Sequence, residues 1–123
     1  MTSIHKMKFR EKHLLKQFGD GQDPIELIKS TTKIDTGGWI RNSNLWLAIF
    51  KDEVVVMAIG RRKYIDRAPL TDITQTHYCH TTGELVLAPI QTMIHRRLKM
   101  SPGDSLRAFD ALGINPSTLS NHT

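Results

Sequence analysis

Apolar residues recur every three or four positions in the first 18 residues, which is the period of an amphipathic helix. We predict a helix over residues 3–18, capped by Ser3 and ended by Gly19. One side of this helix carries Ile4, Met7, Glu11, Leu14, Leu15 and Phe18, whereas Phe9 lies off that stripe. A second, short helix is predicted to begin at Asp23-Pro24, because Asp suits the N-cap and Pro the first helical position.

From residue 34 onward the pattern changes to short segments rich in β-branched and aromatic residues, beginning with Trp39-Ile40. Residues 45–50 and 54–59 are apolar at every position, so we expect a hairpin of two strands covered on both faces. Further strands are predicted at 63–70, 73–80, 84–88 and 94–100, joined by short turns. Short connections favour antiparallel pairing, because a parallel crossover needs about a dozen residues or more.

The clearest local signal is the start of a final helix at Ser101-Pro102-Gly103-Asp104. It combines a serine N-cap, a proline at the first helical position and an acid in the first turn. We expect the helix to end at Gly113, which can adopt a left-handed conformation. Its predicted apolar face consists of Leu106, Ala108, Phe109 and Leu112.

These elements predict an α+β fold that is mainly β. We expect a curled antiparallel sheet or small barrel of about six or seven strands, because so many short strands either curl or split into two layers. The chain of 123 residues has room for one core. We divide it into an N-terminal helical segment at 1–33, the sheet with its closing helix at 34–113, and a polar tail at 114–123.

The order of segments from 45 to 113 includes several local features of one known family. After the hairpin come Tyr64-Ile65, the step Pro69-Leu70-Thr71-Asp72-Ile73, the strand after Gly83, and the helix that opens at Ser101-Pro102. This stretch resembles the bacterial pleckstrin-homology-like domains of the GRAM type. The tryptophan typical of the terminal helix in that family is absent, and Phe109 is the nearest large aromatic residue. The resemblance implies a rigid barrel that binds peptides, lipid head groups or copies of itself.

Composition and charge narrow the class of protein. Apolar residues make up 39% and charged residues 24%, as in ordinary globular proteins. The longest apolar runs have six residues, far short of the roughly 20 that cross a bilayer, and no secretory signal is evident. Cys79 is the only cysteine, which predicts a cytoplasmic location. The net charge is +5, and most of this excess lies in the first 18 residues.

Three groups of basic residues are candidate sites for an anionic partner. Arginine side chains match phosphate oxygens with two hydrogen bonds, although basic turns also serve simply to keep a sheet soluble. The first group is Arg61, Arg62 and Lys63, with Arg67 nearby, and the second is His95, Arg96, Arg97 and Lys99. The third is the N-terminal helix, with Lys6, Lys8, Arg10, Lys12 and Lys16. Its apolar stripe also suits packing on the sheet, and the charges in the second group also suit protection of an edge strand.

The sequence offers little support for catalysis or metal binding. His77, Cys79 and His80 lie close together, but alternation along a strand would turn His80 away from the other two, and no fourth ligand is evident. No phosphate-binding glycine loop, nucleophile elbow or zinc-protease motif is present. We therefore expect no enzymatic activity, no metal and no cofactor.

The sequence thus predicts a non-catalytic interaction module that binds a protein, a peptide or an anionic head group. Self-association into a homo-oligomer is one form of this prediction, suggested by the apolar stripe of the N-terminal helix and by an open sheet edge at 94–100. The alternative is a small basic protein that binds nucleic acid through the N-terminal helix and the arginine-rich strand ends. An anionic lipid surface is a further candidate partner.

Overall fold

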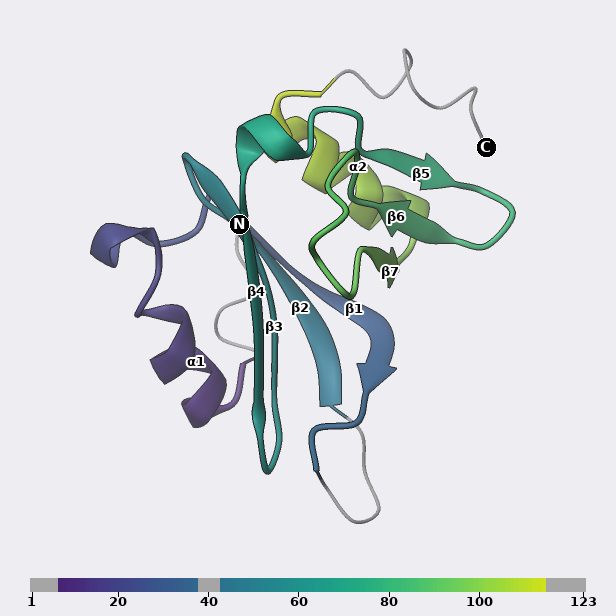
Figure 1. The fold of residues 1–123 in the computed structure, drawn as a ribbon. Coiled ribbons are helices and arrows are strands. Elements are labelled where there is room, and N and C mark those ends of the chain that lie inside the picture. The colour runs from purple at the N-terminus through teal and green to yellow at the C-terminus, as the bar shows by residue number, and fades with distance from the viewer. Residues whose placement is uncertain (1–6, 38–42, 115–123) are drawn as a thin grey trace.

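The computed structural model describes residues 7–37 and 43–114 of the chain (Figure 1). A four-stranded antiparallel sheet has the order β1-β2-β3-β4, formed by Glu26–Ile34, Ser43–Ile49, Glu53–Ile59 and Lys63–Pro69. A three-stranded antiparallel sheet has the order β5-β6-β7, formed by His77–Cys79, Glu84–Val86 and Arg97–Lys99. The α-helices are α1 (Phe9–Leu15) and α2 (Pro102–Leu112), and short 3₁₀ turns lie at Gly19–Gly21 and Leu70–Asp72.

The hairpin of β2 and β3 lies in the middle of the larger sheet and is buried on both faces, as its sequence predicts. Its register pairs Leu47 with Val56 and Ala48 with Val55. Side chains alternate between the faces of a sheet, so the two strands supply two cores. The inner core, between the two sheets and α2, includes Leu45, Leu47, Ile49, Val54, Val56 and Ala58 of the hairpin. The outer core, between the larger sheet and α1, includes Trp46, Ala48, Val55, Met57 and the adjoining Phe50.

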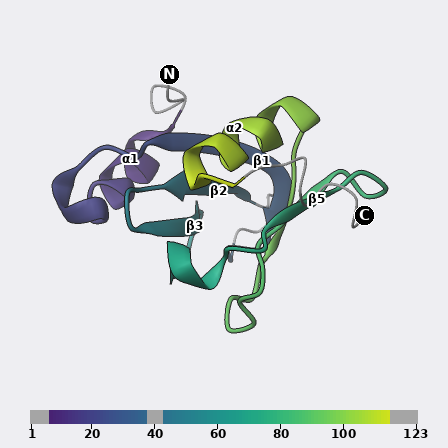
Figure 2. The ribbon, with the colours of Figure 1, turned by 90° about the horizontal axis from the view of Figure 1, so that it is seen from above.

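Helix α1 covers the outer face of the larger sheet, opposite the smaller sheet (Figure 2). The described part of the predicted helix is shorter than expected, because Lys8 is its N-cap and Lys16 its C-cap. Ser3 and Ile4 lie outside the described residues. The rest of the predicted stripe is buried as expected: Met7, Glu11, Leu14, Leu15 and Phe18.

The second helix predicted after Asp23-Pro24 is wrong, because residues 26–34 form strand β1. This strand pairs with β2, with Leu27 opposite Ala48 and Ile28 opposite Leu47. The two side chains point to opposite faces, so Leu27 enters the outer core and Ile28 the inner one. A short isolated helix is marginal in water, and pairing with a buried strand outweighs its local start signal.

The strand predicted at 73–80 is much shorter in the structure, where only His77–Cys79 is extended. The preceding residues form a turn in which the buried Thr76 hydroxyl donates a hydrogen bond to the Ile73 carbonyl over 2.6 Å. The strand predicted at 94–100 is likewise reduced to Arg97–Lys99. Hydroxyl side chains that bond to nearby backbone favour turns over strands.

Helix α2 begins and ends where the sequence predicts. Ser101 Oγ accepts a hydrogen bond from the Asp104 backbone N–H over 3.1 Å, and Gly113 is left-handed at φ 72°. The predicted apolar face is partly wrong, because Leu106 is 55% exposed. The buried side chains are instead Ser105, Ala108 and Phe109, with Leu112 packed at their edge. Their spacing of three and four residues defines one helix face, and Leu106 lies beside it.

The two sheets do not close into a barrel, which corrects that part of the fold prediction. They approach each other where β1 is irregular between Lys29 and Lys33. There the Lys99 backbone N–H donates to Thr32 Oγ1 over 2.7 Å, and Thr31 Oγ1 donates to the Lys99 carbonyl over 3.3 Å. The β7 edge, predicted to be open, is therefore engaged at Lys99 by side chains of β1. Within the described ranges, no helix combines the length and apolar character that crossing a membrane requires.

The loop after β1 is fastened to the tip of the β3–β4 hairpin. The Arg62 backbone N–H donates to the Thr36 carbonyl over 2.6 Å, and Thr36 Oγ1 bonds to Ser43 Oγ over 2.7 Å. Gly60 lies against these hydroxyls, and a Cβ at this position would come within 2.8 Å of Ser43 Oγ and of Thr36 Cβ. This contact leaves no room for a side chain.

We predict that Gly60→Ala lowers the free energy of unfolding by about 1–3 kcal/mol, because Thr36 and Ser43 must move to admit the new methyl group. Urea unfolding of both proteins measures the loss. Gly103→Ala in α2 is the control, because a Cβ added there would come no closer than 3.9 Å to its nearest neighbour, Ser101 Oγ. This change is expected to be neutral or stabilising by up to about 1 kcal/mol. Equal stability of Gly60→Ala and the wild type would contradict the close packing at the hairpin.

Arg107 of α2 binds Glu26 of β1 with two nitrogens and so ties the closing helix to the larger sheet. Burial alone would raise the pKa of Glu26, but hydrogen bonds from Arg107 and from the Leu27 backbone N–H outweigh it and hold the pKa below its usual 4.5. Because the pKa is lower in the folded than in the unfolded protein, this stabilisation is present above about pH 4.5 and is lost as pH falls through the folded value.

Glu26→Gln is therefore expected to cost about 1 kcal/mol at neutral pH, a modest figure because Arg107 is 39% exposed. The difference from the wild type should shrink as the pH falls below about 4. Chemical unfolding across this pH range measures both values, with Asp110→Asn at an exposed position of α2 as the control. A difference that stays constant down to acid pH would contradict the role of the ionised carboxylate.

Candidate functional site

A small hollow lies between α1 and the end of the sheet where β3 turns into β4. Its volume is about 140 Å³, with Leu14 of α1 and Ile59 of β3 among its apolar lining residues. Arg10 of α1 and Lys63 of β4 contribute cationic side chains to the same hollow. We call this feature the α1–β4 hollow. It brings together the N-terminal basic helix and the Arg61–Lys63 turn, which the sequence could only treat as separate groups.

Glu11 orients α1 on the sheet. Its carboxylate is buried, and Oε2 accepts a hydrogen bond from Trp46 Nε1 over 3.1 Å. The other oxygen accepts from the Lys8 backbone N–H over 2.8 Å. Glu11 is the only acidic residue of α1, and these bonds hold it on the inner side of the helix. The outer side of α1 therefore carries cations and no carboxylate.

The basic residues predicted on this helix lie largely in water. Lys8, Arg10 and Lys16 are exposed, Lys12 is half-buried, and Lys6 lies outside the described residues. None of the ion pairs within the described ranges involves them. Their charges are available to an anionic partner.

Phe9 and His13 form an aromatic wall that was not among the residues predicted from the sequence. The Phe9 side chain is 83% exposed, and its ring stacks on His13 with centroids 6.4 Å apart and planes 18° from parallel. Both residues line the α1–β4 hollow. The available signal was the position of Phe9 off the apolar stripe of its helix, because an aromatic residue there must face solvent or a partner.

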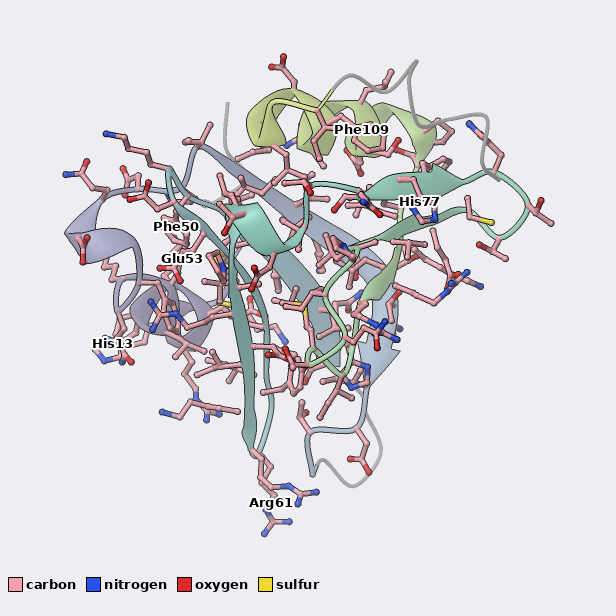
Figure 3. The ribbon with its side chains drawn as sticks, turned by 45° about the horizontal axis from the view of Figure 1, so that its top comes forward. His13, Phe50, Glu53, Arg61, His77 and Phe109 are labelled. Carbon is pink, nitrogen blue, oxygen red and sulfur yellow. The ribbon has the colours of Figure 1, made fainter. Side chains whose placement is uncertain are left out.

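Arg61 projects from the tip of the β3–β4 hairpin, at the end of the sheet (Figure 3), and Arg62 follows it in the same turn. Both are exposed, as is Lys63 at the start of β4. We call Arg10, Arg61, Arg62 and Lys63 the basic end of the molecule. The hydrogen bond between the Arg62 backbone and Thr36 fixes the tip while both guanidinium groups remain in solvent.

Arg67 is not part of this end. It lies four residues further along β4, roughly 13 Å from Lys63 at the usual strand rise. Its guanidinium binds both oxygens of Glu53 at 2.8 and 2.9 Å and lies over the ring of Phe18. Hydrogen bonds from Arg67 hold the pKa of Glu53 below its usual value. The charge of Arg67 is thus largely matched inside the molecule.

Most of the second predicted basic group is paired within the molecule. Arg97 pairs with Glu84 at 2.9 Å, and Arg96 donates to the Ile90 carbonyl. The His95 ring packs edge-on against Tyr64, with centroids 4.9 Å apart. Of the group, only Lys99 has an exposed side chain with no described partner. Three of the four residues therefore have partners inside the molecule, whereas Arg97 and Lys99 remain exposed on the same side of β7.

The opposite end of the larger sheet is acidic. A cavity of about 570 Å³ next to the β2–β3 turn is lined by Phe50, by four acidic residues, Asp20, Asp23, Asp52 and Glu53, and by one basic residue, Lys51. The acidic residues outnumber Lys51 and the Arg67 that pairs with Glu53. Phe50 and Glu53 lie far from Arg61 along the sheet (Figure 3). The larger sheet therefore carries positive charge at one end and negative charge at the other.

His77, Cys79 and His80 are not assembled into a metal site. His77 Nδ1 lies 3.1 Å from the Gln75 carbonyl, and the His80 ring packs edge-on against Tyr78. A hydrogen bond with Thr82 lowers the pKa of the Cys79 thiol. Across residues 7–37 and 43–114, no three His, Cys, Asp or Glu side chains gather closely enough to hold a metal ion.

Comparison with known proteins yields no family model, no curated protein and no solved structure that matches this chain. The candidate site therefore depends on its own geometry. It consists of cations from two elements, one exposed aromatic ring and a small apolar hollow between them.

We predict that Glu11→Ala lowers the free energy of unfolding by about 1–3 kcal/mol, because it leaves the buried Trp46 N–H without an acceptor. Glu11→Gln retains an acceptor oxygen and should lose less. Denaturant unfolding followed by tryptophan fluorescence measures both variants, with Gln17→Ala on the exposed side of the same segment as the control. An equal and small effect of all three changes would mean that Glu11 does not hold α1 in place.

Proposed function

We propose that this protein is a non-catalytic interaction module of the pleckstrin-homology-like type that binds an anionic partner at its basic end. The architecture supports the first part of the proposal. Two antiparallel sheets and a terminal helix packed on them agree with the mainly β fold that the resemblance implies, although the sheets do not close into a barrel. A cytoplasmic location is part of the proposal, in keeping with the single free thiol of Cys79.

The binding of an anionic partner, which is the second part of the proposal, is supported by the position of Arg10 and Lys63 at one hollow. The two residues are 53 positions apart in sequence and come from different elements, yet both line the α1–β4 hollow. Arg61 and Arg62 do not line the hollow, but both are exposed in the turn that leads directly into Lys63. A basic turn that serves only to keep the sheet soluble needs no further basic residue beside it from a second element.

The apolar surface of the described residues favours a partner recognised by charge. The exposed large hydrophobic residues are Phe9, Ile25, Ile65, Ile94 and Leu106, and they come from five different segments. A stable protein interface buries a contiguous surface of roughly 1,000 Å² or more around an apolar centre. Self-association remains a prediction from the sequence, and the observation that supports an anionic partner is the pair of cations at the hollow.

We predict that Arg61→Glu combined with Arg62→Glu weakens binding to a generic polyanion, dextran sulfate, by about tenfold or more at low salt, because two charge contacts are lost. The affinity is measured by titration at several salt concentrations. Lys51→Glu combined with Lys99→Glu changes the net charge equally at exposed positions away from the basic end, and should retain most of the binding. Equal losses in the two double variants would mean that only net charge matters, and the proposed site would be wrong.

A further inference from the structure

The α1–β4 hollow places an exposed aromatic ring beside side chains that bind phosphate. We propose that the basic end binds single-stranded nucleic acid, with a base stacked on Phe9 and phosphates held by Arg10, Lys63 and the Arg61–Arg62 tip. This inference rests on the proposed function, because it names the anionic partner of the same surface.

Phe9 supplies the stacking surface. Its side chain is 83% exposed, although it belongs to a helix whose other large apolar residues are buried. His13 supports one side of the ring in a nearly parallel stack. Bases stack on such exposed aromatic rings with about 1–3 kcal/mol each, whatever their sequence. The aromatic wall of the hollow is therefore suited to an unpaired base.

The size of the hollow agrees with a single planar group. Its volume of about 140 Å³ is well below the roughly 300–1,000 Å³ of typical small-molecule pockets. Leu14 and Ile59 provide apolar contact. Duplex nucleic acid keeps its bases paired and stacked inside, so it offers the hollow no base.

The cations around the hollow follow a path suited to a phosphate chain. Lys63 lines the hollow, and the exposed Arg61 and Arg62 lie in the hairpin turn immediately before it. Arg10 adds a guanidinium from α1. With the only carboxylate of α1 turned inward to Trp46, an anionic strand meets no opposing charge from that helix.

A lipid bilayer suits this surface less well. An interfacial helix binds a membrane by burying an apolar face among the lipids. The apolar face of α1 is already used in the outer core, where Leu14, Leu15 and Phe18 are buried. Phe9 alone remains outward. The combination of one ring with several separated cations matches the alternating bases and phosphates of a single strand.

The test is fluorescence anisotropy with a labelled oligothymidylate of about 12 nucleotides, titrated with the full-length protein at several salt concentrations. The wild type is expected to bind at low salt, and Phe9→Ala should weaken binding about tenfold without changing the salt dependence. Arg61→Glu with Arg62→Glu should reduce the slope of log affinity against log salt by about 1.4, because each phosphate contact contributes about 0.7 for a single strand. Ile94→Ala, at another exposed apolar side chain, is the control for Phe9.

Three results would overturn the inference. They are no binding of the oligonucleotide at low salt, equal binding by Phe9→Ala and the wild type, or equally tight binding of a duplex of the same length. Dextran sulfate and phosphatidylserine vesicles, measured in parallel, separate this inference from the proposed function. If either polyanion binds through Arg61 and Arg62 while the oligonucleotide does not, the nucleic-acid assignment fails and the anionic site stands. If none binds, both fail.

Discussion

Burial of the β2–β3 hairpin on both faces is the constraint on which the rest of the structure depends. Its side chains are almost completely removed from water, with the inner set facing α2 and the smaller sheet and the outer set facing α1. A sheet with two apolar faces requires a cover on each, since an uncovered face would leave several large side chains in water. The outer cover is α1, and this requirement is what brings the basic helix to the sheet.

The elements that the sequence predicts well are those whose signal is local. The hairpin is recognisable from two continuous apolar runs, and α2 from Ser101 at one end and Gly113 at the other. Strand β1 has no such local signal. The residues before it resemble a helix start, and its extended form depends on pairing with β2, a separate segment of the chain. The same limit applies to the smaller sheet, whose strands of three residues are set by contacts with distant segments such as Thr31 and Thr32.

The residues of the candidate site also differ in how well the sequence predicts them, depending on whether their role is set locally or by distant contacts. Runs of charge such as Arg61-Arg62-Lys63 can be read directly, but their availability depends on partners elsewhere in the fold. Arg67 and Arg97 look equivalent to Arg61 in sequence, yet each is held by a glutamate from a neighbouring strand. Arg10, in contrast, gains a role that the sequence does not indicate, because the packing of α1 places it beside Lys63. Phe9 gave a usable sequence signal, because it departs from an otherwise regular stripe.

The larger sheet carries its positive and negative charges at opposite ends. Strands of seven residues separate the Arg61 tip from the acidic cavity beside Asp52, a span of roughly 20 Å. This exceeds the screening length of about 8 Å at physiological salt, so the acidic end does not neutralise the basic one. It does repel a polyanion that approaches from its side, while the net charge of +5 attracts one from a distance. The same fold that buries the hairpin therefore places the cations of the α1–β4 hollow at the end of the sheet that lies away from the acidic cavity.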